Sequence, residues 1–281
     1  MYILIAILAF GFLIAIHELG HFMAAKAFGV KVNEFAIGMG PKLFGKQGKE
    51  TLYSLRLFPV GGFCSMEGED EDSEDPRSFT SQAAWKRAII LAAGAFMNFL
   101  AGFILIIILY MQVHSFVGTT IEGFADGFPP ELQGENGIIA GDTILEVNGE
   151  KTYYSGDFAM FMSRSNGETV DLLIKRGDRK ILLDDFPLTL REYTVDGQAV
   201  MKYGLNMNII EGTVGQRLKY SCYCAYNFVR LVRIGLTDLV TGAAGLKDMA
   251  GPVGIVSTIN DVAKESASRS AAMFNVMYFC A

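Results

Sequence analysis

Hydrophobic residues form long runs at the start and in the middle of the chain and weaker runs toward its end. Residues 1–25 and 88–113 are apolar enough and, at about 1.5 Å per helical residue, long enough to cross or nearly cross a hydrocarbon core. Residues 218–241 form a weaker run that carries two arginines, and residues 271–281 begin another. The pattern predicts two membrane helices, a third transmembrane or interfacial helix, and the start of a truncated last span.

The segment between the first two apolar runs, residues 26–87, contains two stretches with the composition of β-strands. These are residues 32–37 and 51–58, separated by a glycine-rich stretch, and they predict a membrane-associated β-hairpin. An exposed strand edge can hold an extended peptide. The hairpin therefore either pairs with a substrate or is purely structural, and the sequence leaves both open. The acidic run at 67–75 is most simply a solvated loop.

Residues 118–205 differ from the rest of the chain because they are polar, with short alternating runs and turn signals. Residues 143–147 lead into Asn148-Gly149, a strong hairpin signal, and residues 155–164 have the pattern of a short helix. Several strands with one helix in under a hundred residues predict a compact soluble domain.

The distribution of positive charge predicts how the chain is oriented. Lysines and arginines are spread along residues 26–87, whereas residues 111–130 carry none. By the positive-inside rule, the loop at 26–87 lies in the cytosol. The N-terminus and the soluble domain then lie outside.

Composition agrees with a mixed protein and excludes some functions. The chain has 281 residues, of which 51% are hydrophobic and 19% charged, so it is too apolar for an ordinary soluble domain and too charged to be membrane throughout. A net charge of −6 without a basic patch argues against nucleic acid as a partner. The four cysteines form no C-x-x-C pair and are interpreted as small apolar residues rather than a disulfide frame or a second metal site.

Two histidines and a glutamate interrupt the first apolar run. His17 and His21 are four residues apart and share one face of a helix, so both can hold one metal ion while Glu18 lies beside a bound water. This is the H-E-x-x-H pattern of zinc hydrolases. A single buried histidine is usually structural, but ionisable groups at membrane depth are functional by default.

The second apolar run contains a polar residue in a face of small residues. Gly94, Asn98 and Gly102 recur every four residues, which favours close helix packing. Asn98 either belongs to an ordinary packing face or stabilises the oxyanion of a tetrahedral intermediate. The spacing does not separate these two roles.

Several motifs together resemble the site-2 protease family of intramembrane zinc metalloproteases, in its bacterial PDZ-containing branch of the regulator-of-sigma-E protease type. The segment 138–149 is similar to a PDZ signature, so the soluble domain at 118–205 is expected to be one PDZ module. The other motifs are His17-Glu18-Leu19-Gly20-His21 and residues 37–44, 53–56, 59–63, 85–87, 94–98 and 251–255.

The resemblance implies a fold and a set of site residues. The fold is a multi-span α-helical membrane protein with a cytosolic β-hairpin loop and an inserted extracytoplasmic PDZ (α+β) domain. His17 and His21 ligate Zn²⁺, Glu18 acts as general base and then acid, and Asn98 positions or stabilises the reacting carbonyl. The family takes its third ligand from an aspartate in an Asn-x-x-Pro-x-Pro-x-Leu-Asp-Gly pattern that this sequence lacks, and neither Asp248 nor Asp261 has that context. The chain as given is therefore expected to be C-terminally incomplete, to bind zinc poorly and to be inactive.

The implied activity is hydrolysis of peptide bonds in or near transmembrane segments of single-span proteins in the bacterial inner membrane. Anti-sigma factors and signal-peptide remnants are the implied substrates, in regulated intramembrane proteolysis. The PDZ domain either binds peptide C-termini or excludes bulky substrates. The alternative is a catalytically inactive, PDZ-bearing membrane adaptor that lacks the third zinc ligand.

Overall fold

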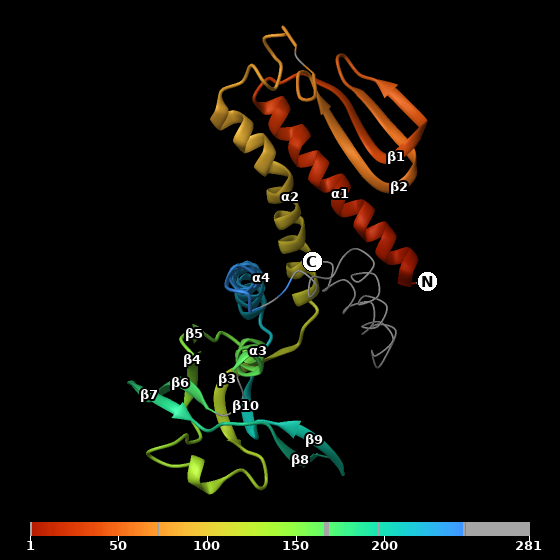
Figure 1. Cartoon of the computed structure of the whole chain (residues 1–281). Helices are drawn as coiled ribbons and strands as arrows, with labels where there is room; N and C mark the ends of the chain where they lie inside the picture. Colours follow the sequence, from red (N-terminus) through yellow and green to blue (C-terminus); the bar gives the residue numbers. More distant parts are fainter. Residues whose placement is uncertain (1, 72, 166–168, 196, 244, 246–281) are drawn as a thin grey trace. The chain divides into compact units, whose positions relative to one another are not determined.

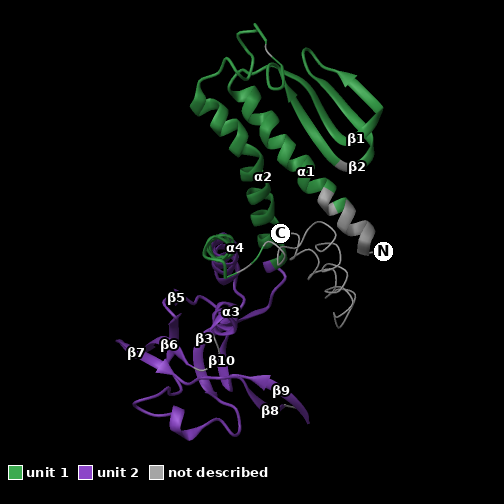
Figure 2. Ribbon diagram, in the orientation of Figure 1, with its two compact units in different colours: residues 1–109, 231–281 green, residues 110–230 purple. Residues whose placement is uncertain are grey.

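The computed structural model describes residues 2–71, 73–165, 169–195, 197–243 and 245 (Figure 1). The chain divides into two compact units, one of residues 1–109 with 231–281 and the other of residues 110–230 (Figure 2). Each unit has its own antiparallel sheet and its own buried residues.

Two helices form the framework of the first unit: α1 spans Tyr2–Ala27 and α2 spans Ala84–Tyr110. Just after α1, Gly29 adopts a φ of +78°, a left-handed conformation that suits glycine and commonly ends a helix. The two helices touch at Gly20, where a Cβ would lie 2.4 Å from the carbonyl oxygen of Ala93. Glycine at this position therefore permits the close approach of α1 and α2, which lie beside each other (Figure 1).

The sheet of the first unit consists of β1 (Val32–Gln47) and β2 (Leu52–Met66), which pair antiparallel. Because β2 doubles back, Ala36 of β1 is opposite Ser54 on one side and Phe63 on the other. Residues 62–66 therefore form an outer strand, and β2 packs against α1.

Both strands are longer than the sequence pattern predicts. Most of the glycine-rich stretch at 38–48, which the sequence suggests is a separator, belongs to β1. Gly38 and Gly40 have φ values of +86° and +82°, and β1 turns back near them, so that Glu34 and Gln47 both lie opposite Leu52.

One buried cluster joins the end of α1, the sheet and α2. It continues into the loop between β2 and α2 through Phe79, and half-buried Phe22 and Phe35 pack against it. The loop is therefore held against the same end of α1 that carries the histidines. The buried members are Ala25, Val30, Val32, Cys64, Met66, Phe79 and Ile90.

The second unit contains a sheet with strand order β10-β3-β4-β6-β7, with β5 paired to β4, and a separate hairpin of β8 and β9. The predicted turn at Asn148-Gly149 is confirmed: it joins β4 to β5, and both residues have positive φ. A helix, α3 (Ser155–Arg164), and a short 3-10 helix, η1 (Pro130–Leu132), complete it. The strands are β3 (Ser115–Phe124), β4 (Thr143–Val147), β5 (Glu150–Lys151), β6 (Val170–Arg176), β7 (Arg179–Phe186), β8 (Arg191–Val195), β9 (Gln198–Lys202) and β10 (Leu205–Glu211).

The last described helix, α4 (Val214–Thr241), begins in the second unit. Within that unit the Tyr220 ring stacks on Phe116, with ring centroids 4.2 Å apart and an interplanar angle of 9°. Further along α4, Arg230 is buried and forms an ion pair with Asp157 of α3. This part of α4 is therefore anchored to the sheet and helix of the second unit.

The prediction of a multi-span α-helical membrane protein is wrong. The described residues contain four α-helices, and by length and composition α2 alone qualifies as a candidate membrane span. Much of the remaining described chain forms antiparallel sheets. α4 is not apolar enough to qualify because charged residues recur along it, and the predicted last span at 271–281 lies outside the described residues. The charged residues of α4 are Arg217, Lys219, Arg230, Arg233 and Asp238.

Candidate metal centre

The H-E-x-x-H residues lie on α1 where it faces α2. The centroids of the His17 and His21 rings are 4.8 Å apart, and the rings meet edge to face at 77°. This follows from the helix itself, because residues four apart lie one turn above each other on the same face. The helix therefore brings the two imidazoles together without help from any loop.

The two rings direct the same nitrogen to one place. A Cβ built on Gly94 of α2 would lie 2.5 Å from Nε2 of His21 and 2.6 Å from Nε2 of His17. Both rings therefore turn Nε2 toward the same residue of α2, an arrangement in which two imidazoles can share one metal ion. Gly94 has no room for a side chain, because a Cβ there would overlap both imidazoles.

The opposite nitrogen of each ring faces α2. His21 Nδ1 lies 2.7 Å from the carbonyl oxygen of Ile90, and a carbonyl only accepts, so Nδ1 carries the proton and donates it. Its Nε2 is then free to bind a metal. His17 Nδ1 lies 3.3 Å from the Asn98 amide, which places this predicted site residue against a histidine.

Glu18 lines a pocket of about 490 Å³ beside the histidines. A Cβ on Gly62 would lie 3.4 Å from Cγ of Glu18, so the carboxylate side chain runs past the outer strand of β2. The strand supplies residues 63–66 to the pocket wall. The other lining residues are His21, Glu69, Asp70 and Leu91.

The described residues supply part of a zinc site. Two imidazole nitrogens converge at Gly94 and a carboxylate lies on the same helix beside them, which fits the donor set of a catalytic zinc. Within the described ranges, no group of three or more His, Cys, Asp or Glu side chains is arranged to hold a metal. Asp248 and Asp261 both lie outside those ranges.

Comparison with known proteins bears on what this centre does. The family model described as Peptidase family M50 matches residues 5–281. The chain belongs to peptidase family M50. This confirms the resemblance to the site-2 proteases at the level of the family.

Three relatives of this M50 chain share most of its length. A Clostridium perfringens protein is 37% identical over 270 residues, which cover 95% of this chain and 78% of the relative. A Clostridium acetobutylicum protein is 37% identical over 260 residues, covering 90% and 73%. A Fusobacterium nucleatum protein is 30% identical over 273 residues, covering 94% and 77%. Each relative is named as a "putative zinc metalloprotease", which supports protease activity and Zn²⁺ as the metal of this M50 chain.

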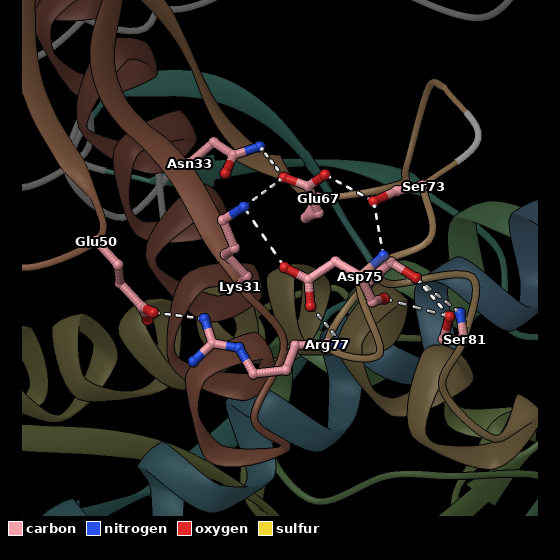
Figure 3. A network of polar contacts seen from close by, with 9 residues as sticks. Lys31, Asn33, Glu50, Glu67, Ser73, Asp75, Arg77 and Ser81 are labelled. Atoms are coloured by element: carbon pink, nitrogen blue, oxygen red, sulfur yellow. Dashed lines mark hydrogen bonds and ion pairs between the residues drawn. The ribbon is translucent and has the colours of Figure 1, made fainter.

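The acidic run at 67–75 is more than a solvated loop in the M50 chain. Glu67 accepts hydrogen bonds from Lys31, Asn33 and Ser73, and Lys31 also lies 3.5 Å from Asp75 (Figure 3). These contacts lower the pKa of Glu67 to about 2, with the Ser73 hydroxyl as the largest cause. The network fixes the loop that carries Glu69 and Asp70 to the pocket.

The sequence pattern missed two features of the site. The spacing of Gly94 indicates helix packing, whereas the structure places it against the Nε2 atoms of both histidines, where a side chain would not fit. Glu69 lines the pocket, and burial raises its pKa. Neither feature has a local signal, because each depends on which element packs against the histidines.

Cys64 also lines the pocket, and burial raises its thiol pKa to about 12. A thiol with so high a pKa stays protonated at neutral pH and is a poor zinc ligand. The interpretation of Cys64 as an apolar core residue is consistent with this chemistry.

Proposed function

We propose that this chain is a zinc-dependent endopeptidase that cuts single-span membrane proteins in or near their membrane segments. The observation that carries the proposal is the convergence of His17 Nε2 and His21 Nε2 at Gly94, with Glu18 in the adjoining pocket. When bound, zinc supplies a Lewis acid that polarises the scissile carbonyl.

The protein's own residues supply binding and proton transfer. His17 and His21 hold the metal through Nε2. Glu18 takes a proton from the attacking water on its carboxylate and delivers it to the leaving amine nitrogen, as a general base and then a general acid. The third metal ligand is not assigned to any residue of this chain.

An extended substrate segment is held beside the outer strand of β2. Residues 63–66 line the same pocket as Glu18, so a peptide added to this edge brings its backbone to the carboxylate. Backbone hydrogen bonds at a strand edge bind a chain with little regard to side chains. This suits a protease whose substrates share an unwound membrane segment rather than a sequence.

The proposal extends to cellular context. α2 crosses the bacterial cytoplasmic membrane with residues 26–87 in the cytosol, which is supported by its apolar character and by the charge of that loop. The domain at 118–205 is a PDZ module on the outer side that takes peptide C-termini. Anti-sigma factors and signal-peptide remnants are the substrate class, in regulated intramembrane proteolysis.

Substituting Glu18→Gln tests the assignment of the base. Cleavage of a co-expressed single-span reporter should fall by about 10²- to 10⁴-fold, the usual contribution of a general base, while zinc content stays unchanged. Glu122→Gln, at an exposed carboxylate on β3, is the matched control and should cleave at the unaltered rate. Cleavage by the Glu18→Gln variant at the unaltered rate would refute the role of Glu18.

A further inference from the structure

The Asn98 side chain makes one contact and lacks another. Its Nδ2 atom lies 3.3 Å from Nδ1 of His17, whereas its Oδ1 atom is buried and has no hydrogen-bond partner within the described part of the chain. A buried, unpartnered amide oxygen is costly and calls for an explanation.

The chemistry of a metal-binding histidine bears on the orientation of this amide. If His17 binds a metal through Nε2, its proton is on Nδ1, which is then a donor that needs an acceptor. The amide NH₂ group only donates, so it cannot serve. Rotating the amide by half a turn exchanges its nitrogen and oxygen with almost no change in shape. Oδ1 then accepts the proton of His17 Nδ1, and Nδ2 takes the buried position without a partner, so the case for this orientation is the acceptor that a metal-bound His17 needs.

Asn98 lies on the same face of α2 as two other residues that contact the histidines. Ile90, Gly94 and Asn98 follow each other at intervals of four, so they lie along one face of the helix. The Ile90 carbonyl accepts from His21, Gly94 lets both rings approach α2, and Asn98 lies against His17. One face of α2 thus serves both histidines of α1.

We propose that Asn98 is a positioning residue whose Oδ1 accepts the Nδ1 proton of His17 and so holds Nε2 toward the metal. This inference rests on the proposed zinc function. It differs from the role in oxyanion stabilisation that the family resemblance suggests. The amide lies against Nδ1, on the side of the ring away from Nε2, and acts on the reaction through the ligand.

The test compares zinc affinity among variants of the detergent-solubilised chain, measured by competition with a chromogenic chelator. Asn98→Ala and Asn98→Leu remove the acceptor and should weaken zinc binding by about 10- to 100-fold, as is usual when the partner of a ligating histidine is lost. Asn98→Asp keeps an acceptor and removes the donor, so it should bind zinc at least as tightly as the unaltered chain. Phe96→Leu, at an exposed position on the same helix, is the control and should leave the affinity unchanged.

A second readout separates positioning from direct action on the substrate. At saturating zinc, Asn98→Ala should recover most of its cleavage rate, because only metal binding was impaired. Thermal unfolding without metal should differ little between Asn98→Asp and Asn98→Leu, so that a loss of fold does not imitate the effect.

The outcomes are distinguishable. Zinc affinity in Asn98→Ala equal to that of the unaltered chain overturns the inference alone. So does an Asn98→Asp variant that binds as weakly as Asn98→Ala, because the amide would then act as a donor. An unaltered chain that binds no zinc overturns the proposed function and, with it, the inference.

Discussion

Two clusters of buried polar groups, one in each unit, differ in how their polar atoms are partnered. In the second unit, Arg230 and Asp157 are 4% and 0% exposed and form an ion pair of 3.0 Å. In the first unit, the cluster of His17, His21 and Asn98 directs two imidazole nitrogens toward Gly94 and leaves an amide oxygen without a partner. Buried polar groups are costly in both places, but only the second unit holds a charge and its counter-charge side by side.

The Arg230 cluster is closed by contacts within the second unit. The guanidinium donates to the Asn227 amide oxygen at 2.6 Å and 3.0 Å and to the backbone carbonyl of Lys151, and it stacks over the Phe161 ring. Asp157 accepts from the backbone N–H of Tyr153 at 2.8 Å. Asp157 Oδ1 accepts no hydrogen bond but lies 3.0 Å from the Arg230 guanidinium, so its charge is compensated within the unit and the ion pair fixes α4 to α3.

The histidine cluster is complete only at its Nδ1 atoms. These have neighbours in Ile90 and Asn98, whereas both Nε2 atoms point toward Gly94. The comparison teaches that buried charges mark structure when each has its counter-charge beside it, and that buried imidazoles mark function when their second nitrogens converge on one point.

The largest effect is expected from adding a side chain at Gly94, which would push the two histidines apart. Gly94→Ala places a methyl group within 2.6 Å of both Nε2 atoms, so zinc binding and cleavage should be lost altogether. Gly235→Ala, in open surroundings on α4, is the matched control and should leave both unchanged. Zinc binding by the Gly94→Ala variant at the unaltered affinity would show that the metal does not lie at the convergence of the two rings. Zinc competition and reporter cleavage measure the two effects.

A smaller effect is expected from removing the buried counter-charge of Arg230. Asp157→Ala leaves a buried guanidinium without its counter-charge and should destabilise the second unit by about 3–5 kcal/mol. Urea unfolding, monitored by hydrogen exchange in β4 and β6, measures the loss in free energy of unfolding. Replacing both partners, with Asp157→Leu and Arg230→Met, should cost much less because no uncompensated charge remains.

Zinc binding should hardly change in Asp157→Ala, because the ion pair belongs to the second unit. The exposed Asp178→Ala is the control for stability and should change it by no more than about 0.5 kcal/mol. If Asp157→Ala is as stable as that control, the cluster is not the structural element that its contacts indicate.

The smallest effect concerns the loop network of Figure 3. The hydrogen bond from Ser73 is the largest cause that lowers the pKa of Glu67 from 4.5 to about 2. Outside the residues labelled in Figure 3, the hydrogen bond from Lys26 is the largest cause that lowers the pKa of Glu50 from 4.5 to about 2. A lowered folded-state pKa means that the contribution to stability is complete above about pH 5 and is lost as the pH falls from 4.5 toward 2. Hydrogen exchange in residues 67–82 should therefore quicken between pH 4.5 and 2 beyond the intrinsic change in exchange rate, while β6 stays protected. Because these carboxylates are partly exposed, the change should be local, and Glu67→Gln should show the faster exchange already at pH 6.

Some of the candidate site could be predicted from the sequence because it depends on local geometry. His17, Glu18 and His21 share a helix face by spacing alone, and the turn at Asn148-Gly149 depends only on its own backbone preferences. The family could likewise be identified from motifs in order along the chain. These signals need no knowledge of what packs against them.

Other features were decided only by the tertiary structure. The role of Gly94, the contact of Asn98 with His17 and the position of Glu69 in the pocket each depend on residues of the H-E-x-x-H segment that lie 48 or more positions away in the chain, which spacing cannot supply. The apolar pattern also predicted several spans, whereas α4 uses Arg230 to reach a buried aspartate in the second unit. The sequence by itself determined which side chains could bind a metal. Packing decided which nitrogen atoms converge and on which residue of α2, because those depend on the approach of α2 to α1.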